Sequence, residues 1–302
     1  MFLLLCGSLI AREANSNAGT SGFAFLKINT GARATGMGGA FTGLADDETA
    51  LYYNPAGIAS LEGRHYLAEY HNYFSDLQNG MVGYLHEVRY GTVIGAYLSY
   101  LDYGEFTRTD EAGNVLGEFG GGDMVLGLSA ATTRGESYRF GATLKFIYET
   151  IEDYSATGVA LDLGARYNTF RGRYTAGLAI QNLGVQLSSL GEQKDDLPLM
   201  VRAGGSATPR GLPMTIAGDV IVPVDNDIDF AVGAEYFEFK PLYIRAGWNS
   251  FGSNYKADGT EDTWAGFAFG AGFDLRKMHI AYAVTLAADL GESHRITLTG
   301  GF

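Results

Sequence analysis

The sequence predicts an all-β protein, a 14-stranded antiparallel transmembrane β-barrel whose lumen holds an N-terminal plug with short helices. Three observations predict this fold. From about Arg64 to Phe302 the chain divides into apolar β-segments of about 9–14 residues, the length of tilted strands that cross a bilayer. Each segment alternates between an apolar face and a face of small or charged residues. The connections between segments also alternate, in both length and charge.

Every second connection is short and basic, and the connections between those are longer and acidic. The basic residues are Arg89, Arg134, Arg171, Arg173, Arg210, Lys240, Arg276 and Lys277. The acidic connections are Asp102–Glu118, Glu149–Asp153, Glu192–Asp196, Asp225–Asp229 and Asp258–Asp262. Such sorting is expected when each rim of a barrel faces its own compartment.

We expect strands at 62–74, 80–88, 91–102, 122–133, 137–150, 155–168, 172–183, 197–208, 212–222, 227–238, 240–249, 263–275, 277–289 and 293–302. Between them, the longest surface loop covers about Tyr103–Gly121. The even total places both termini on one side of the membrane, which we interpret as the periplasm. We therefore expect a multi-pass protein of a Gram-negative-type outer membrane, in contact with its lipid.

The composition agrees with a barrel and excludes one class of partner. The chain has 302 residues with 43 glycines, 19 tyrosines and 18 phenylalanines. Aromatic residues form girdles at the two lipid–water boundaries of such barrels, and glycines occupy crowded lumenal positions. The formal net charge of −13 argues against nucleic-acid binding, which needs a basic surface.

The chain divides into three expected parts. Residues 1–18 resemble a secretory signal peptide that lacks its basic start, as a misplaced start codon would produce. Its Cys6, the single cysteine, fits a lipoprotein anchor poorly because Leu5 is not small, so we interpret it as part of a discarded signal. Residues 19–61 are rich in glycine and alanine without strand alternation, and we expect them to plug the barrel that residues 62–302 form.

Charged residues fall on the expected lumenal face of several strands. They could line a polar route or clamp a substrate, but we favour a structural role, in which they pair across strands and bind the plug backbone. These residues are Arg139, Lys145, Asp162, Arg166, Arg202, Asp219, Glu235 and Arg245.

The sequence contains no convincing catalytic, cofactor or metal site. The acidic run Asp225–Asp229 has oxygen ligands at alternating positions but lacks the glycine and distant glutamate of a calcium loop, so we expect a solvated hairpin. The five histidines never fall at the spacing of metal ligands. Since no serine lies in a nucleophile motif, we expect a non-enzymatic protein without a cofactor.

The stretch FLKINTGARATGMGGAFTGLADDETALYYNPAGIASL resembles the start of the PorV/PorQ family of outer-membrane proteins. More distantly, its ADD and NPA segments resemble the plug of the FadL/TodX long-chain fatty-acid transporters. The residues of this plug motif are Gly31, Gly36, Gly38, Gly39, Asp46, Asp47, Asn54, Pro55, Ala56 and Gly57. The chain end, with Ile296, Leu298 and Phe302, resembles the C-terminal signal that the barrel-assembly machinery recognises.

The resemblance implies one of two functions. A PorV/PorQ-type barrel works in protein secretion and surface presentation, as in the type IX secretion system, with secreted cargo or secretion-system proteins as partners. A FadL-like barrel instead lets a hydrophobic small molecule, such as a long-chain fatty acid, diffuse past its hatch and through a lateral opening in the wall. The sequence favours the first function because the motif matches that family better.

Overall fold

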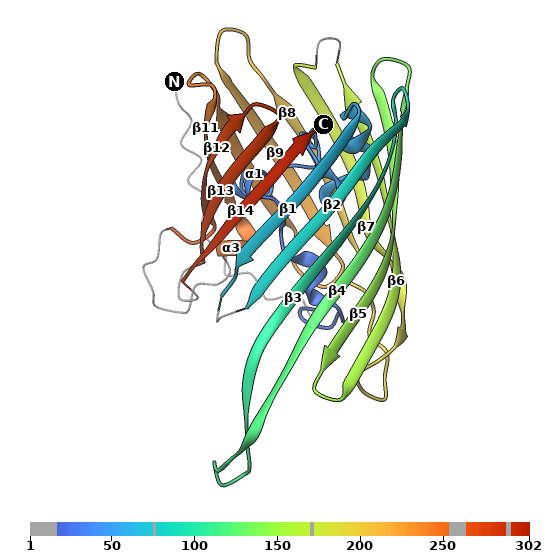
Figure 1. The fold of residues 1–302 in the computed structure, drawn as a ribbon, viewed down its shortest axis with the longest axis vertical. Helices are drawn as coiled ribbons and strands as arrows, with labels where there is room; N and C mark the ends of the chain where they lie inside the picture. The colour runs from blue at the N-terminus through green and yellow to red at the C-terminus, as the bar shows by residue number, and fades with distance from the viewer. Residues whose placement is uncertain (1–16, 75–76, 170–171, 254–263, 288–290) are drawn as a thin grey trace.

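In the computed structural model, the described residues are 17–74, 77–169, 172–253, 264–287 and 291–302. Most of the expected signal peptide, Arg171 and the acidic run Asp258–Asp262 lie outside these ranges. The described part of the chain forms a closed barrel of fourteen strands, in which each strand pairs antiparallel with the next and β1 pairs with β14 (Figure 1). The predicted fold class is therefore confirmed.

The strands follow the alternating segments of the sequence. Their bounds are β1 Arg64–Asn72, β2 Gln78–Arg89, β3 Thr92–Thr109, β4 Val115–Arg134, β5 Tyr138–Ile151, β6 Tyr154–Asn168, β7 Tyr174–Ser188, β8 Met200–Ala207, β9 Met214–Pro223, β10 Asp229–Tyr236, β11 Leu242–Asn249, β12 Phe267–Leu275, β13 Met278–Leu286 and β14 Glu292–Gly301. A short helix, α3 (Ser250–Ser253), follows β11.

The largest difference from the expected strands is a long hairpin. The expected loop Tyr103–Gly121 is instead mostly paired backbone, because β3 and β4 continue beyond a register shift at Asp102 and Glu105. Figure 1 shows this hairpin projecting well beyond the other loops of its rim. The rings of Phe106 and Phe119 lie opposite each other on it, with centroids 5.4 Å apart, and such cross-strand aromatic pairs stabilise a hairpin.

The two faces of the wall differ as the alternation predicts. On β5, Leu144 and Phe146 are 43% and 44% exposed, whereas the intervening Lys145 is 1% exposed. The exposed set is the surface that would contact lipid, and the buried set faces the lumen. Among the described residues, no helix is long and apolar enough to cross a membrane.

The N-terminal segment lies inside the barrel and contains four short helices, η1 (Ala24–Lys27), α1 (Ala32–Gly36), α2 (Ala50–Tyr53) and η2 (Pro55–Ser60) (Figure 1). The α2 helix ends at Tyr53, because Asn54 precedes a proline and adopts an extended conformation. The Asn54 side chain then accepts a hydrogen bond from Ala56 N at 3.1 Å and caps η2.

The described N-terminal residues cross the lumen from one rim to the other. Gly22 N donates to Asp196 O at 3.0 Å, so this end of the chain lies at the rim that carries the β3–β4 hairpin. At the opposite rim, Phe302 N donates to Arg64 O at 3.0 Å. The even strand count thus brings Arg64 and Phe302 to one rim, whereas residues 17–23 lie at the other. We call residues 17–61 the plug.

Candidate functional site

The candidate site is the lumen, where the backbone of the plug contacts the backbone of the wall. A Cβ placed at Gly247 would lie 2.1 Å from Gly38 N, and one at Gly43 would lie 2.6 Å from Gly205 Cα. A Cβ at Gly36 would lie 3.1 Å from Gly270 Cα. Glycine on the plug therefore meets glycine on the wall, and side chains at these positions would force the two apart.

Other residues of the plug motif fix the conformation of the plug itself. Gly31 and Gly39 have φ of 78° and 83°, in the region that favours glycine. A Cβ at Gly57 would lie 2.2 Å from Ala45 O, so the turn around α2 and η2 needs glycine there. Pro55 lies against the wall, because a Cβ at Gly141 would lie 2.4 Å from its carbonyl carbon.

Arg33 of the plug is the centre of a charged cluster with β10 and β11. Its Nε and Nη2 donate to the two carboxylate oxygens of Glu235 at 2.9 and 3.0 Å. Arg245 Nε donates to the same carboxylate at 2.7 Å. Asp46 and Asp47 accept from Arg33 Nη1 at 2.6 and 3.0 Å. Burial lowers the pKa of the Arg33 guanidinium, but the surrounding carboxylates outweigh it and raise that pKa well above its ordinary value.

A second cluster joins the plug to β8 and β9. Asp219 Oδ2 accepts hydrogen bonds from Phe41 N at 3.1 Å and from Thr42 N and Oγ1 at 2.9 and 2.6 Å. Arg202 donates to Gly39 O at 2.7 Å and lies 3.4 Å from Asp219. These side chains bind the orphaned backbone groups of the plug, as a non-helical buried segment requires.

The remaining predicted lumenal charges have three different surroundings. Arg166 donates to Gly43 O and Leu44 O at 2.9 and 2.5 Å, so it too binds the plug. Lys145 and Asp162 form an ion pair of 2.6 Å within the wall. Arg139 is half-buried, and its Nε and Nη1 have no hydrogen-bond partner in the part of the chain that the structure describes.

Sequence reasoning missed a third cluster, on β1 and β14. Glu69 Oε2 accepts from Gly31 N at 2.5 Å, and Arg295 Nε lies 3.2 Å from Glu69 Oε1. Arg295 also donates to Asn29 O at 2.6 Å and to Thr35 Oγ1. The alternation of β14 contained the signal, because Arg295 directly precedes the exposed apolar Ile296 and so lies on the opposite face of the strand.

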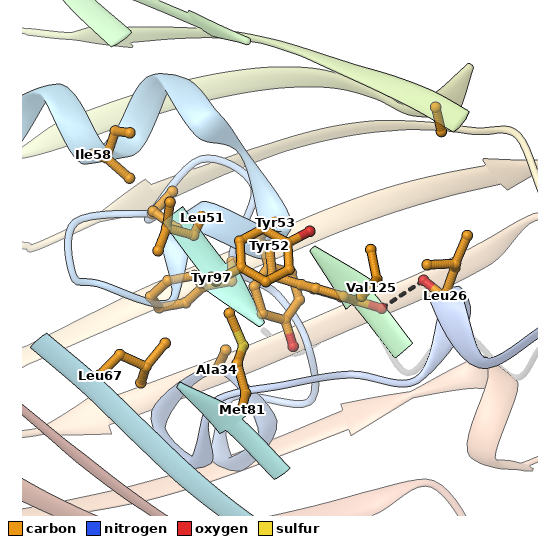
Figure 2. Packing of buried hydrophobic residues seen from close by; sticks show 14 of the residues in the cluster. Leu26, Ala34, Leu51, Tyr52, Tyr53, Ile58, Leu67, Met81, Tyr97 and Val125 are labelled. Carbon is orange, nitrogen blue, oxygen red and sulfur yellow. Dashed lines mark hydrogen bonds between the residues drawn. The ribbon is translucent and has the colours of Figure 1, made fainter. Parts of the chain in front are cut away.

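The plug contacts β2, β3 and β4 mainly through apolar and aromatic side chains. Leu51, Tyr52 and Tyr53 pack there against wall residues that are at most 3% exposed, and Figure 2 shows part of this packing. The wall residues are Met81, Leu85, Val93, Tyr97, Leu101 and Val125. Among the described residues, one hydrogen bond joins these strands to the plug, donated by Thr133 Oγ1 to Ala59 O at 3.3 Å. We call this side the apolar sector, and the side formed by β6, β8–β11, β14 and β1 the polar sector.

Among the described residues, two large cavities lie one at each end of the plug. The mouth cavity, about 500 Å³, lies at the hairpin rim and is lined by aromatic and aliphatic side chains, among them Phe23, Phe25, Tyr73, Leu101 and Tyr103, with the carboxylates of Asp123 and Glu149. The base cavity, about 420 Å³, lies at the rim of the C-terminus and is lined mostly by charged groups, including Arg33, Glu235, Arg276 and Lys277. The two cavities share no lining residue, so the plug separates them.

The other predicted sites lie at the rims. Asp225, in the acidic run considered for calcium, pairs with Lys27 of the plug at 2.6 Å. Within the described ranges, no group of three or more histidine, cysteine or acidic residues could hold a metal ion. At the chain end, Ile296 and Phe302 are exposed on the outer surface, Leu298 is half-buried, and the ring of Phe302 lies 6.3 Å from that of Tyr66.

Solved structures of other β-barrel proteins share this architecture. The Pseudomonas putida toluene transporter TodX superposes with a TM-score of 0.57 at 11% identity, covering 86% of this chain and 95% of that one. A Pseudomonas aeruginosa FadL homologue gives a TM-score of 0.55 at 13% identity, covering 89% and 97%. At such identities the likeness concerns the fold alone. The comparison therefore shows that the protein has a FadL/TodX-like β-barrel fold.

Sequence comparison defines the family. The model of UPF0164, described as an uncharacterised protein family, matches residues 8–160, just over half of the chain. The protein belongs to this family. A UPF0164 protein of Treponema pallidum (strain Nichols) is 25% identical over 223 residues, which cover 67% of this chain and 52% of that protein. The chain thus spans about half the length of the curated relative that it matches.

Proposed function

We propose that this barrel carries hydrophobic small molecules passively across the outer membrane, with the plug as its hatch. The observation that carries the proposal is the mouth cavity, which the first residues of the plug form together with apolar side chains of β3. A cavity of about 500 Å³ with aromatic walls and some charged groups has the size and character of a small-molecule site.

The apolar sector supplies a route from this cavity. Leu101 lines the mouth cavity, and Tyr97 and Val93 follow it on the same inward face of β3, with Ser99 and Gly95 between them. Leu51 of the plug covers this line, since a Cβ at Gly95 would lie 3.1 Å from its Cδ2. In the proposed mechanism, the polar sector holds the plug in place while side chains of the apolar sector move aside for the passing molecule.

Uptake of a neutral hydrophobic fluorophore, N-phenyl-naphthylamine, by cells that carry the barrel tests this function. Leu101→Asp places a charge in the proposed route and should reduce the barrel-dependent uptake about tenfold, because a hydrophobic molecule cannot solvate it. Phe106→Asp, on the same strand but on the projecting hairpin, is the matched control and should leave uptake unchanged. Equal uptake by all three proteins and by cells without the barrel would refute the proposal.

A second candidate, surface presentation of secreted proteins as in the PorV/PorQ type, is favoured by the projecting hairpin. Its exposed side chains include Phe106, Val115 and Leu116, which are 40%, 68% and 63% exposed. Exposed apolar side chains beyond a membrane rim are typical of a surface that binds another protein. Shortening the hairpin by deleting residues 105–119 should then abolish presentation of cargo but preserve uptake of the fluorophore. Preserved presentation of cargo together with loss of fluorophore uptake would reject this candidate.

A further inference from the structure

The mouth cavity contains two carboxylates that face each other directly. Asp123 of β4 and Glu149 of β5 are register partners, and both line the cavity. Partners in an antiparallel pair have their Cα atoms about 4.5–5.5 Å apart, so the two charges are neighbours. Like charges in this relation destabilise a sheet unless something neutralises them.

No cation of the described chain neutralises this pair. Neither Asp123 nor Glu149 forms an ion pair within the described residues, and Lys27, the cationic residue of the cavity lining, is bound to Asp225 at 2.6 Å. Asp123 is 2% exposed; its Oδ2 accepts from Tyr103 Oη at 2.7 Å, while its Oδ1 has no partner among the residues that the structure describes. A buried carboxylate oxygen without a partner is costly, so the site favours a ligand that supplies positive charge.

The walls of the cavity indicate which kind of cation fits. The rings of Phe23, Phe25, Tyr73 and Tyr103 line the same space as the carboxylates. Aromatic faces attract organic ammonium groups, and a metal ion would need more oxygen ligands than two carboxylates offer. A volume of about 500 Å³ also accommodates an organic molecule with a hydrophobic body.

We propose that the mouth cavity binds lipophilic organic cations, amines or quaternary ammonium compounds with a hydrophobic body, through Asp123 and Glu149. This inference rests on the proposed transport function and specifies its substrate class. The carboxylates bind the ammonium group, and the aromatic rings and Leu101 contact the hydrophobic part. The acidic connections of this rim then attract cations toward the mouth.

Isothermal titration calorimetry of the full chain in an uncharged detergent tests this assignment. The probes are benzyltrimethylammonium and neopentylbenzene, its neutral isostere with carbon in place of nitrogen. We expect the wild type to bind the cation about tenfold more tightly than the isostere. Asp123→Asn and, independently, Glu149→Gln should each remove most of this preference and leave binding of the isostere unchanged. Glu118→Gln, an exposed acid of the same strand, removes the same formal charge and should have no effect.

The outcomes separate this inference from the function on which it rests. Equal affinity of the wild type for both probes would overturn the cation site but agree with transport of neutral hydrophobic molecules. Binding of neither probe would overturn both. An equal loss of cation affinity in Glu118→Gln and Asp123→Asn would also overturn the site, because it would show a general charge effect. Heat-modified migration in gel electrophoresis verifies that each variant is folded, and Glu149→Gln decides the question if Asp123→Asn does not fold.

Discussion

The polar and apolar sectors hold the same plug by different physical means. In the polar sector, Asp219 accepts from a backbone N–H of the plug, Arg295 donates to a plug carbonyl, and Glu235 pairs with the side chain of Arg33. In the apolar sector, Leu51 and its neighbours pack against the wall with little directional bonding. Directional bonds to a buried partner allow one arrangement, whereas apolar contacts tolerate small displacements. The comparison indicates that the plug is anchored on one side and adaptable on the other.

The largest expected effect is in the polar sector, at Glu235. Glu235→Ala leaves the guanidinium groups of Arg33 and Arg245 facing each other without their shared carboxylate. Breaking a buried ion pair in this way costs about 3–5 kcal/mol in the free energy of unfolding. Urea unfolding in detergent measures this cost. Glu238→Ala, an exposed acid close by, should change stability little, and a similar cost for both variants would show that the polar sector does not anchor the plug.

Leu51→Ala tests the apolar sector. Leu51 is fully buried, and its truncation should cost about 2–5 kcal/mol in the free energy of unfolding. The same change widens the proposed route, so uptake of the neutral fluorophore should rise although stability falls. If uptake falls in proportion to stability, the apolar sector is only a packed interface and the proposed route is wrong.

Glycines of the wall give a smaller, matched test of the close backbone contacts. Gly247→Ala places a methyl group 2.1 Å from Gly38 N and should cost about 1–3 kcal/mol in the free energy of unfolding through overpacking. Gly218→Ala, on β9, meets its nearest atom at 3.7 Å and should be tolerated. Thermal unfolding of the two variants in detergent measures the difference. Equal melting temperatures would contradict the contact between plug and wall at β11.

The smallest effect is expected from a covalent lock at β13, on the side of the plug next to the polar sector. Ala32 of the plug packs against Ala281 and Ala283 of β13, so cysteines at Ala32 and Ala283 should form a disulfide. If this side of the plug stays in place during transport, uptake should be the same before and after reduction. Strong inhibition by the disulfide, reversed by reductant, would instead show that the whole plug must move.

The sequence predicted the wall better than the interior. Strand alternation with period two is a local signal, and the burial in the structure follows it: Lys145 and Asp162 are buried, whereas Leu144 and Phe146 are exposed. It failed at the β3–β4 hairpin, because the glycines around Gly120 and the shift at Asp102 resemble a loop. The hydrogen bond from Gly22 N to Asp196 O, which places the N-terminal residues at the hairpin rim, also had no signal in the local sequence.

Contacts between plug and wall could not be predicted from the sequence alone. Asp219 binds Thr42 across a separation of 177 residues, and no pattern in the chain relates the two. The composition indicated only that glycines of the plug would approach other backbone closely. Which wall glycines they meet, such as Gly247 for Gly38, depends on the tilt and register of the closed barrel.

We expect the plug to close the lumen of the barrel to water and ions. Single-channel conductance in planar bilayers tests this closure, by comparing the full chain with a variant that lacks Gly31–Leu61. We expect the full chain to conduct little and the shortened chain to open large, steady pores, because a barrel of fourteen strands is wide enough for water and ions once it is emptied. Equal conductance of the two proteins would contradict the claim.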